Sequence, residues 1–376
     1  MFIRKTDSLI NPQFWAEDGL FFIQQYNNGI SAMFIPHAGY LHLVPRTIAL
    51  LVDFFSVPYA WVPAVYNYLS LAVALSIVGS VFSPRFRVNN KPLIALSIVL
   101  VPHYSNEVFL TITNLQWMLA LMMVVVLAKE QPSNKYGNTV MQYVYDLFVI
   151  IICGLSGPFI MFLAPFFAWK WGKNRTSYNA LVFIIVSLIA FVQFKFVISE
   201  AIYSQEFNMN LETYSSFLGK KYFGVLFLGN QIAYKINGYI LCSLYLTLLV
   251  LLLYLASQRQ DDAVFIFIGV SLVLLLSVSY KFRSNLEILI TPSDGVRYFY
   301  IPSVMLVWSL ISLLEKSRKW IAILLALAMF ASFTSGFRNK PLKDYNWNFY
   351  SELIEKKDVI IPINPEGWKI NVKARP

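Results

Sequence analysis

Two adjacent carboxylates near the start of the chain, Glu17 and Asp18, are the residues best suited to chemistry. They stand in the sequence Phe-Trp-Ala-Glu-Asp-Gly over 14–19, where Trp15 offers an aromatic face beside them. A carboxylate whose pKa is tuned by its surroundings can take a proton from an attacking hydroxyl as a general base. Because like charges this close repel, we expect one of the two acids to have a raised pKa. The plainer alternative is an acidic helix start, in which Asp18 caps a helix beginning at 20–22.

A second polar strip follows, with His37, Tyr40, His42 and Arg46 close together in the sequence. Arg46 could neutralise a phosphate, and a histidine or tyrosine could hold a sugar hydroxyl. The alternative is the start of a helix lying in the membrane interface, with the polar ends of its side chains reaching water.

Further cations that could bind a phosphate occur later in the chain, and they are Lys220, Lys221, Arg283 and Arg297. Arg297 stands close to Asp294 and Tyr298. Its guanidinium could make two parallel hydrogen bonds to a phosphate leaving group. The alternative for this strip is aromatic anchoring at the membrane surface together with contacts to lipid headgroups.

The sequence gives little support for a metal or nucleotide site. The three histidines form no His-x-x-x-His motif, and the two cysteines, Cys153 and Cys242, lie inside apolar runs. No glycine-rich phosphate loop follows a strand, which favours a donor activated by a lipid phosphate over a nucleotide sugar. We therefore expect a metal-independent reaction without a cofactor.

The composition is that of a membrane protein. Of the 376 residues, 57% are hydrophobic and only 13% are charged, whereas soluble domains are about 25% charged. In lipid each segment must satisfy its own backbone hydrogen bonds, which selects helices. The net charge of +10 is explained by cationic cytoplasmic loops, and no cationic cluster with interleaved aromatics indicates nucleic-acid binding. The first ten residues lack the apolar core of a signal peptide.

The apolar runs predict an all-α polytopic bundle of about nine or ten transmembrane or re-entrant helices. The clear candidates cover 58–82, 109–128, 178–198, 238–257, 262–280, 298–314 and 320–335. The run 92–103 is short, and 140–169 contains Gly-Leu-Ser-Gly-Pro at 154–158, which predicts two short helices meeting at a turn. Polar residues interrupt 40–56, so that segment fits an interfacial helix better than a crossing.

The cations also predict sidedness. They occupy alternate connections, which the positive-inside rule places in the cytoplasm: 83–91, 129–139, 170–177, the turn at Arg259, and 316–319. The chain then divides into an extracytoplasmic acidic loop with an interfacial helix (1–57), a transmembrane bundle (58–335) and an extracytoplasmic tail (336–376). The tail could shape an acceptor site or cap the bundle. Nothing before Asp18 could carry the acidic loop across a membrane, so we expect either a preceding helix or unaided translocation of the short N-terminal segment.

Three motifs together resemble bacterial GT-C membrane glycosyltransferases. They are Phe-Trp-Ala-Glu-Asp-Gly, His-Ala-Gly-Tyr-Leu followed by Pro-Arg, and Arg-Tyr-Phe-Tyr-Ile-Pro at 297–302. The overall plan is similar to that of phage-type, serotype-converting O-antigen glucosyltransferases, although the motif match is confined to 14–46 and 294–302. In that family a helix ordinarily precedes the acidic loop, and this sequence has none there.

The resemblance implies an undecaprenyl-phosphate sugar donor, a lipid-linked surface polysaccharide such as O-antigen as acceptor, and a site on the periplasmic face of the bacterial inner membrane. The family's catalytic carboxylate would correspond to Glu17 or Asp18. We accordingly predict an inverting hexosyltransferase, transferring glucose in the simplest case, with Asp18 as general base and Glu17 as its neighbour. The donor phosphate would contact Arg297, Arg46, Lys220, Lys221 and Arg283. The sugar and acceptor would contact Trp15, His37, Tyr40, His42, Asp294 and Tyr298.

Two other functions remain open at this point. One is an O-antigen polymerase or ligase, which acts on similar lipid-linked glycans. The other is a flippase or transporter of lipid-linked sugars, which should show inverted repeats and charges at mid-membrane. No repeat stands out, and only a few ionisable residues, such as Asp146 and Lys195, fall within or near the apolar runs.

Overall fold

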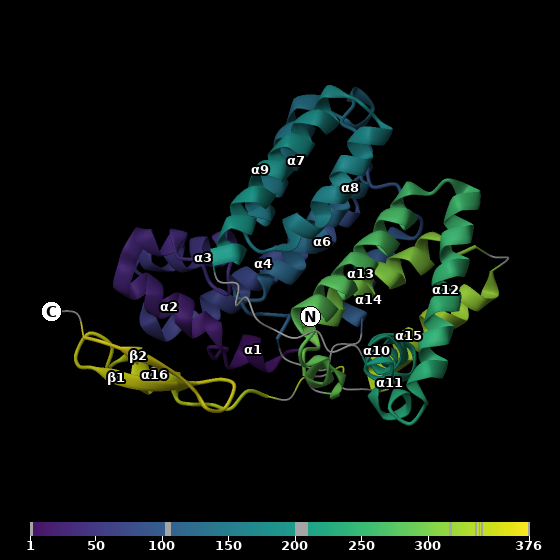
Figure 1. Cartoon of the computed structure of the whole chain (residues 1–376). Coiled ribbons are helices and arrows are strands. Elements are labelled where there is room, and N and C mark those ends of the chain that lie inside the picture. Colours follow the sequence, from purple (N-terminus) through teal and green to yellow (C-terminus); the bar gives the residue numbers. More distant parts are fainter. Residues whose placement is uncertain are drawn as a thin grey trace.

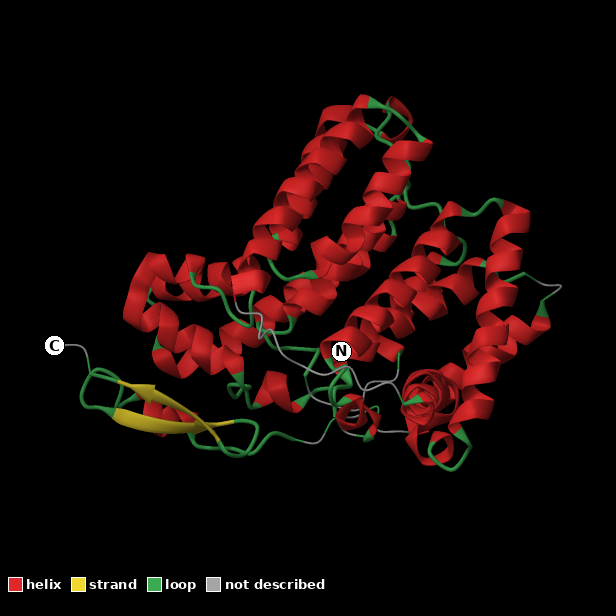
Figure 2. Ribbon diagram, viewed as in Figure 1, coloured by secondary structure: helices red, strands yellow, loops and turns green. Residues whose placement is uncertain are grey.

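The computed structural model describes residues 3–101, 107–199, 210–292, 294–315, 318–334, 337, 339 and 341–374. It is mostly helical, as Figure 2 shows. Four helices are long and apolar enough to cross a membrane: α4 (Val62–Val81), α9 (Ser177–Ser199), α12 (Gly238–Arg259) and α13 (Asp262–Lys281). The prediction of a helical membrane protein is therefore confirmed at this level.

The other predicted crossings are also helical but shorter. They are α5 (Lys91–Leu100), α6 (Leu115–Ala128), α7 (Thr139–Gly154), α8 (Phe159–Lys173), α14 (Arg297–Ser312) and α15 (Lys319–Thr334). The predicted break at 154–158 separates α7 from α8, because Gly157 adopts a φ of 153° and Pro158 precedes the new helix.

The cation-rich connections gather at one end of the bundle, toward the top of Figure 1. Buried Arg85 donates to buried Asp146 at 2.6 Å, and the Glu130 amide donates to the Arg85 carbonyl at 2.8 Å. Lys173 pairs with Asp262, and Arg259 pairs with Glu315. The Arg85 contacts join α7 to the connections that follow α4 and α6. The other two pairs join α8 to α13, and α12 to the connection that follows α14; η3 (Asn134–Tyr136) lies in the connection after α6.

The opposite end carries short elements instead of full-length helices. From the first part of the chain these are α1 (Asp7–Ile10), α2 (Glu17–Asn28), η1 (Gly29–Phe34), α3 (Leu43–Phe54) and η2 (Tyr59–Trp61). The twelve residues of α3 are too few to cross a bilayer. Its first amides are capped by the 154–158 turn, since Leu43 N donates to Leu155 O at 3.0 Å and Val44 N to Ser156 Oγ at 2.9 Å.

Residues 211–233 lie between two of the predicted crossings and are also helical. They form α10 (Leu211–Ser215), a π-helix η4 (Ser216–Gly224) and α11 (Val225–Ala233). The segment packs tightly on α12, where a Cβ at Gly219 would collide with the backbone at Gly238 and Cys242. The short 3-10 helix η5 (Leu286–Ile290) follows α13 and packs on η4.

The tail adds one small hairpin to this otherwise helical fold. After α16 (Trp347–Ser351), strands β1 (Val359–Ile363) and β2 (Trp368–Val372) form an antiparallel hairpin with Ile361 opposite Ile370. The hairpin lies against α2 (Figure 1). Ala16 N donates to Asn364 O at 2.5 Å, and Asn364 N donates to Phe14 O at 3.2 Å. The tail therefore holds the acidic loop in place.

Candidate functional site

Asp18 lies in the first turn of α2 and is almost completely buried, with 1% of its surface exposed. It does not cap the helix, because α2 begins at Glu17 and its N-cap is Ala16. Thr113 donates two hydrogen bonds to Asp18 Oδ1, from its backbone N at 2.9 Å and from its Oγ1 at 2.8 Å. The other carboxylate oxygen, Oδ2, takes part in neither bond. Glu17 is only half-buried and reaches the surface of this end of the molecule.

The backbone just before the two acids is strained. Ala16 has a φ of 46° and a ψ of −119°, a combination that favours glycine. The two backbone bonds of the hairpin to Phe14 and Ala16 fix this conformation. Strained residues of this kind concentrate at functional sites, where the surrounding structure over-determines them.

Burial controls the charge of Asp18. Removal from water raises the pKa of Asp18 to about 7, while the two Thr113 hydrogen bonds and the nearby Lys5 charge lower it and the Glu17 charge raises it. Lys5 is itself buried, donates to Phe109 O at 2.7 Å, and has its pKa lowered by burial to about 7. The raised pKa expected for one of the two acids therefore falls on Asp18, and desolvation is its main cause, ahead of repulsion from Glu17.

Arg297, at the start of α14, lies near Glu107 and Glu17. It pairs with Glu107 at 3.2 Å, and the negative charge of Glu17 also acts on it. Beside it, Tyr298 packs edge-on against Trp117, with ring centroids 5.5 Å apart. Lys281 Nζ donates to the Tyr298 hydroxyl at 3.4 Å.

Tyr40 completes this group. Burial raises the pKa of Tyr40 to about 12, and the charges of Arg297 and Glu17 act on it together with the amide of Gln116. The structure thus brings five predicted site residues to one end of the bundle, and three further residues join them. We call this set the Asp18 cluster: Lys5, Glu17, Asp18, Tyr40, Glu107, Thr113, Arg297 and Tyr298.

Trp15 lies at the border of the cluster. Its ring is 5.7 Å from Lys5 Nζ and partly exposed, so it offers an aromatic face beside the acids. His37 and His42 lie behind Tyr40, where the His42 ring is 4.7 Å from the Tyr40 ring. Burial lowers the pKa of His42 to about 3, and its Nε2 lies 3.2 Å from His37 O. His42 is therefore a neutral support for Tyr40 and not a surface contact for a sugar.

Two of the predicted phosphate ligands are buried elsewhere. Arg46 is fully buried beneath the Phe21 ring, 4.4 Å from its centroid, and donates to Ile35 O at 3.1 Å. Lys221 is also buried and donates to Thr291 O and, at 3.0 Å, to Pro292 O. Neither side chain reaches the surface to meet a phosphate, although Arg46 Nε and Nη1 have no hydrogen-bond partner among the described residues.

The remaining predicted residues lie outside the Asp18 cluster. Arg283 donates to Tyr280 O at 3.1 Å and lies over the Tyr280 ring, at the end of its own helix. Asp294 is exposed and accepts a hydrogen bond from Thr291 Oγ1 at 2.7 Å. Lys220 is partly exposed on η4. Arg297 is the one predicted phosphate ligand that the described structure brings to the acids.

Sequence reasoning missed Lys5, Glu107 and Thr113. The run 109–128 was predicted to be one crossing, but its first residues lie outside α6, and Leu110 adopts a φ of 57°. The sequence Thr-Ile-Thr-Asn at 111–114 could have indicated that the helix begins later, because its polar residues interrupt the apolar run. Hydroxyl and amide side chains favour turns and helix starts over apolar helix interiors.

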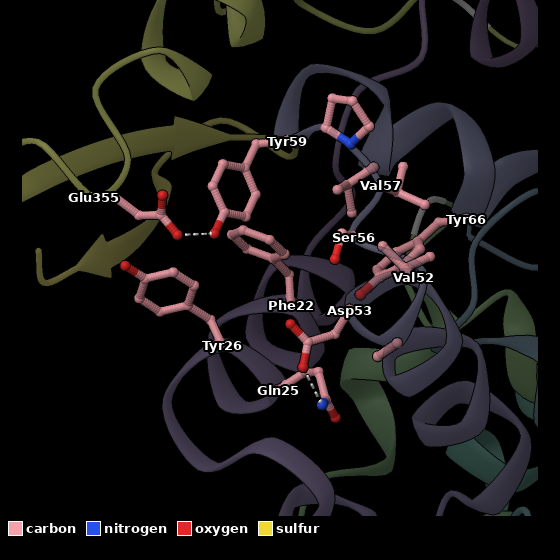
Figure 3. Close-up of a pocket in the computed structure, with 13 residues that line it drawn as sticks. Phe22, Gln25, Tyr26, Val52, Asp53, Ser56, Val57, Tyr59, Tyr66 and Glu355 are labelled. Atoms are coloured by element: carbon pink, nitrogen blue, oxygen red, sulfur yellow. Dashed lines mark hydrogen bonds between the residues drawn. The ribbon is translucent and has the colours of Figure 1, made fainter. Parts of the chain in front are cut away.

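A cavity of about 290 Å³ opens further along α2 (Figure 3). It is lined by residues of α2, α3, the connection to α4 and α4 itself, and by Glu355 of the tail, but by no residue of the Asp18 cluster. Among the described residues, no group of three or more His, Cys, Asp or Glu side chains is arranged to hold a metal ion.

The Asp18 cluster has the groups that an acid–base reaction on an anionic substrate needs. It combines a carboxylate with a pKa near neutrality, a partly exposed second acid, and a guanidinium on which the charge of that second acid acts. Comparison of the chain with protein-family models, with curated proteins and with solved structures gives no match.

Proposed function

We propose that the chain is a membrane-embedded glycosyltransferase that moves a hexose from a polyprenyl-phosphate donor to a lipid-linked polysaccharide. The observation that carries this proposal is the convergence of Glu17, Asp18, Tyr40, Arg297 and Tyr298 at one end of a helical bundle. These residues come from three separate parts of the sequence. The resemblance to GT-C enzymes, which rested on the same motifs, supports the same function.

In the proposed reaction Asp18 is the general base. An acceptor hydroxyl oxygen attacks the anomeric carbon of the donor sugar while its proton passes to the Asp18 carboxylate. The bond from the anomeric carbon to the phosphate oxygen breaks, and the polyprenyl phosphate leaves with the bonding electrons. Attack opposite the leaving group inverts the configuration at that carbon.

Arg297 is the proposed partner of the leaving phosphate. Its side chain is one-third exposed and, among the described residues, forms an ion pair with Glu107. The phosphate gains negative charge as the bond breaks, so a guanidinium placed there stabilises the transition state more than the ground state. Glu17 is proposed to orient the acceptor hydroxyl, because it is the more exposed of the two acids.

The proposed location is the outer face of a bacterial inner membrane. The Asp18 cluster and the cation-rich connections lie at opposite ends of the bundle (Figure 1). The positive-inside rule assigns the cation-rich end to the cytoplasm. Lipid-linked donors and acceptors would then meet the acids on the periplasmic side.

The test is a transfer assay on the purified full chain with polyprenyl-phosphate glucose and lipid-linked O-antigen. We expect one hexose per acceptor repeat, and at least a 100-fold loss of kcat in Asp18→Asn, a typical value for removal of a general base. Addition of whole repeat units would indicate a polymerase or ligase. Full turnover in both Asp18→Asn and Glu17→Gln would overturn the proposal.

A matched control is Asp262→Asn at the other end of the bundle, where Asp262 pairs with Lys173 and is half exposed. This variant makes the same chemical change away from the Asp18 cluster. Its turnover should stay within about twofold of the wild type, since surface ion pairs contribute little.

A further inference from the structure

The 290 Å³ cavity beside α2 has a lining suited to a neutral polar ligand. Its volume is near the lower limit of small-molecule pockets, which span roughly 300–1,000 Å³. One wall is aromatic: Phe22, Tyr26 and Tyr59 pack against one another, with ring centroids 6.0 to 6.3 Å apart. The opposite side, seen in Figure 3, carries the hydrogen-bonded pair Gln25 and Asp53.

The exposed polar groups of this cavity include two carboxylates, Asp53 and Glu355. Gln25 is 3% exposed, and its Nε2 donates to Asp53 Oδ2 at 2.9 Å. The remaining lone pairs of the Asp53 carboxylate can accept hydrogen bonds from O–H or N–H groups of a ligand. Glu355, which accepts from the Tyr59 hydroxyl at 2.5 Å, adds a carboxylate at the rim.

Charge excludes an anionic ligand from this cavity. Two carboxylates line it, and none of its described lining residues is Lys or Arg. A phosphate would be repelled, whereas hydroxyl groups would be accepted. A hexopyranose has an apolar face of C–H groups and an edge of hydroxyls, which match the aromatic wall and the acceptors respectively.

The cavity lies beside side chains suited to the lipid surface. Phe54, Phe55 and Trp61 flank it in sequence and are 75%, 70% and 65% exposed. Aromatic side chains exposed in this way at the start of a membrane helix anchor a protein in the headgroup region. A ligand in the cavity would therefore be held at the depth of a lipid-linked glycan.

Two rim residues also have strained backbones. Ser56 has a φ of 51° and Glu355 has a φ of 74°. Neither is glycine, and both line the mouth of the cavity. Non-glycine residues held at positive φ concentrate at ligand clamps.

We propose that this cavity is a subsite for one neutral hexopyranose unit of a lipid-linked glycan. The assignment to the acceptor rests on the proposed function, because Asp18, Phe22 and Gln25 lie on one face of α2 at spacings of four and three residues. Seven residues of helix rise about 10 Å. A glycan chain bound at Gln25 would then extend along α2 toward the base.

The test is saturation-transfer NMR on the full chain in nanodiscs free of glycosidic detergent. The probes are methyl β-D-glucopyranoside, octyl β-D-glucopyranoside, glucosamine and inorganic phosphate. We expect saturation of the sugar ring protons with both glucosides, at least tenfold tighter binding of the octyl compound, and no competition by phosphate. Equal affinity for the two glucosides would contradict the lipid-linked part of the proposal. Tighter binding of glucosamine than of the glucosides, or competition by phosphate, would contradict the proposal that the cavity binds a neutral sugar.

Asp53→Leu removes the exposed carboxylate of the cavity and should weaken glucoside binding about tenfold, the loss of one hydrogen bond. Asp262→Leu, at a half-exposed position at the other end of the bundle, is the matched control and should bind as the wild type. Unchanged binding in Asp53→Leu would overturn the subsite. The measurement needs no donor and should give the same result in Asp18→Asn. If the wild type binds the glucoside but transfers no hexose, only the proposed function is contradicted.

Discussion

At the scale of single residues, the properties of Asp18 follow from two opposing effects. Burial disfavours its charged form, whereas Thr113 stabilises that form with two hydrogen bonds. Desolvation is the larger effect, and the resulting pKa of about 7 suits a general base working near neutral pH. The same residue exposed at the surface would have a pKa near 4 and would be a much weaker base.

We therefore predict that the transfer rate rises with pH, with a midpoint near 7. The base must be ionised, so below the midpoint the rate should fall about tenfold per pH unit. Glu17→Gln should move the midpoint down, because the Glu17 charge raises the pKa of Asp18. Lys5→Met should move it up, because the Lys5 charge lowers that pKa. A pH-independent rate between pH 5 and 8 in wild type would contradict this assignment.

Arg297 and Arg283, both predicted from the sequence to bind the donor phosphate, should differ in their effect on the transfer rate. Arg297→Gln should lower kcat about 10²- to 10³-fold, as expected for loss of one transition-state charge contact. Arg283→Gln should change kcat less than threefold, because Arg283 contacts Tyr280 of its own helix end and not the acids. Transfer assays on both variants check this, and equal losses would show that the wrong cation has been chosen.

At the scale of elements, the position of the acids depends on the contact between α2 and the hairpin. A Cβ at Gly19 would lie 2.7 Å from Ile363 Cδ1 and 2.9 Å from Ile370 Cγ2. Gly19→Ala should therefore destabilise the fold by about 1–3 kcal/mol, as overpacking does. Ile363→Val shortens the closer side chain and should recover part of that loss, as measured by the melting temperature in detergent.

The matched control is Gly172→Ala, since a Cβ at Gly172 meets nothing within 4 Å in α8. That change should leave the melting temperature equal or slightly higher, because alanine favours a helix over glycine. A Gly19→Ala variant as stable as Gly172→Ala would show that the hairpin does not pack closely against α2 at Gly19.

The sequence predicted helices better than the segments between them. Every predicted crossing contains a helix, because an apolar run in lipid has few alternatives. The sequence did not reveal that 107–114 runs past α2, since that path depends on contacts of this segment with Lys5, Asp18 and Arg297 from distant positions. For the same reason Arg46 and Arg297 looked equivalent, although only the fold decides which cation is buried under a ring. No helix was predicted over 211–233, where glycines allow close packing on α12.

At the scale of the whole molecule, a buried carboxylate in α7 binds several groups at the cation-rich end. Asp146 is fully buried and accepts hydrogen bonds from Arg85 and, at 2.6 Å, from Tyr178, with Lys129 at 3.9 Å. Asp146→Asn would leave buried cations without a counter-charge and should cost about 3–5 kcal/mol. Glu130→Gln, which breaks the exposed pair with Arg87, should cost less than about 1 kcal/mol. Similar melting temperatures for the two variants would contradict a stabilising role of Asp146.

The central claim is that the Asp18 cluster and the cation-rich end face opposite sides of a membrane. Glu366 is 81% exposed in the hairpin turn, two residues from Asn364, which bonds the acidic loop. Lys135 is exposed at the other end.

The most direct measurement is labelling of single cysteines at these two positions with a membrane-impermeant maleimide, with Cys153 and Cys242 replaced by serine. In intact bacterial cells, Glu366→Cys should react, and Lys135→Cys should react only after permeabilisation. The reverse pattern would place the acids in the cytoplasm, away from a periplasmic donor, and would contradict the proposed function.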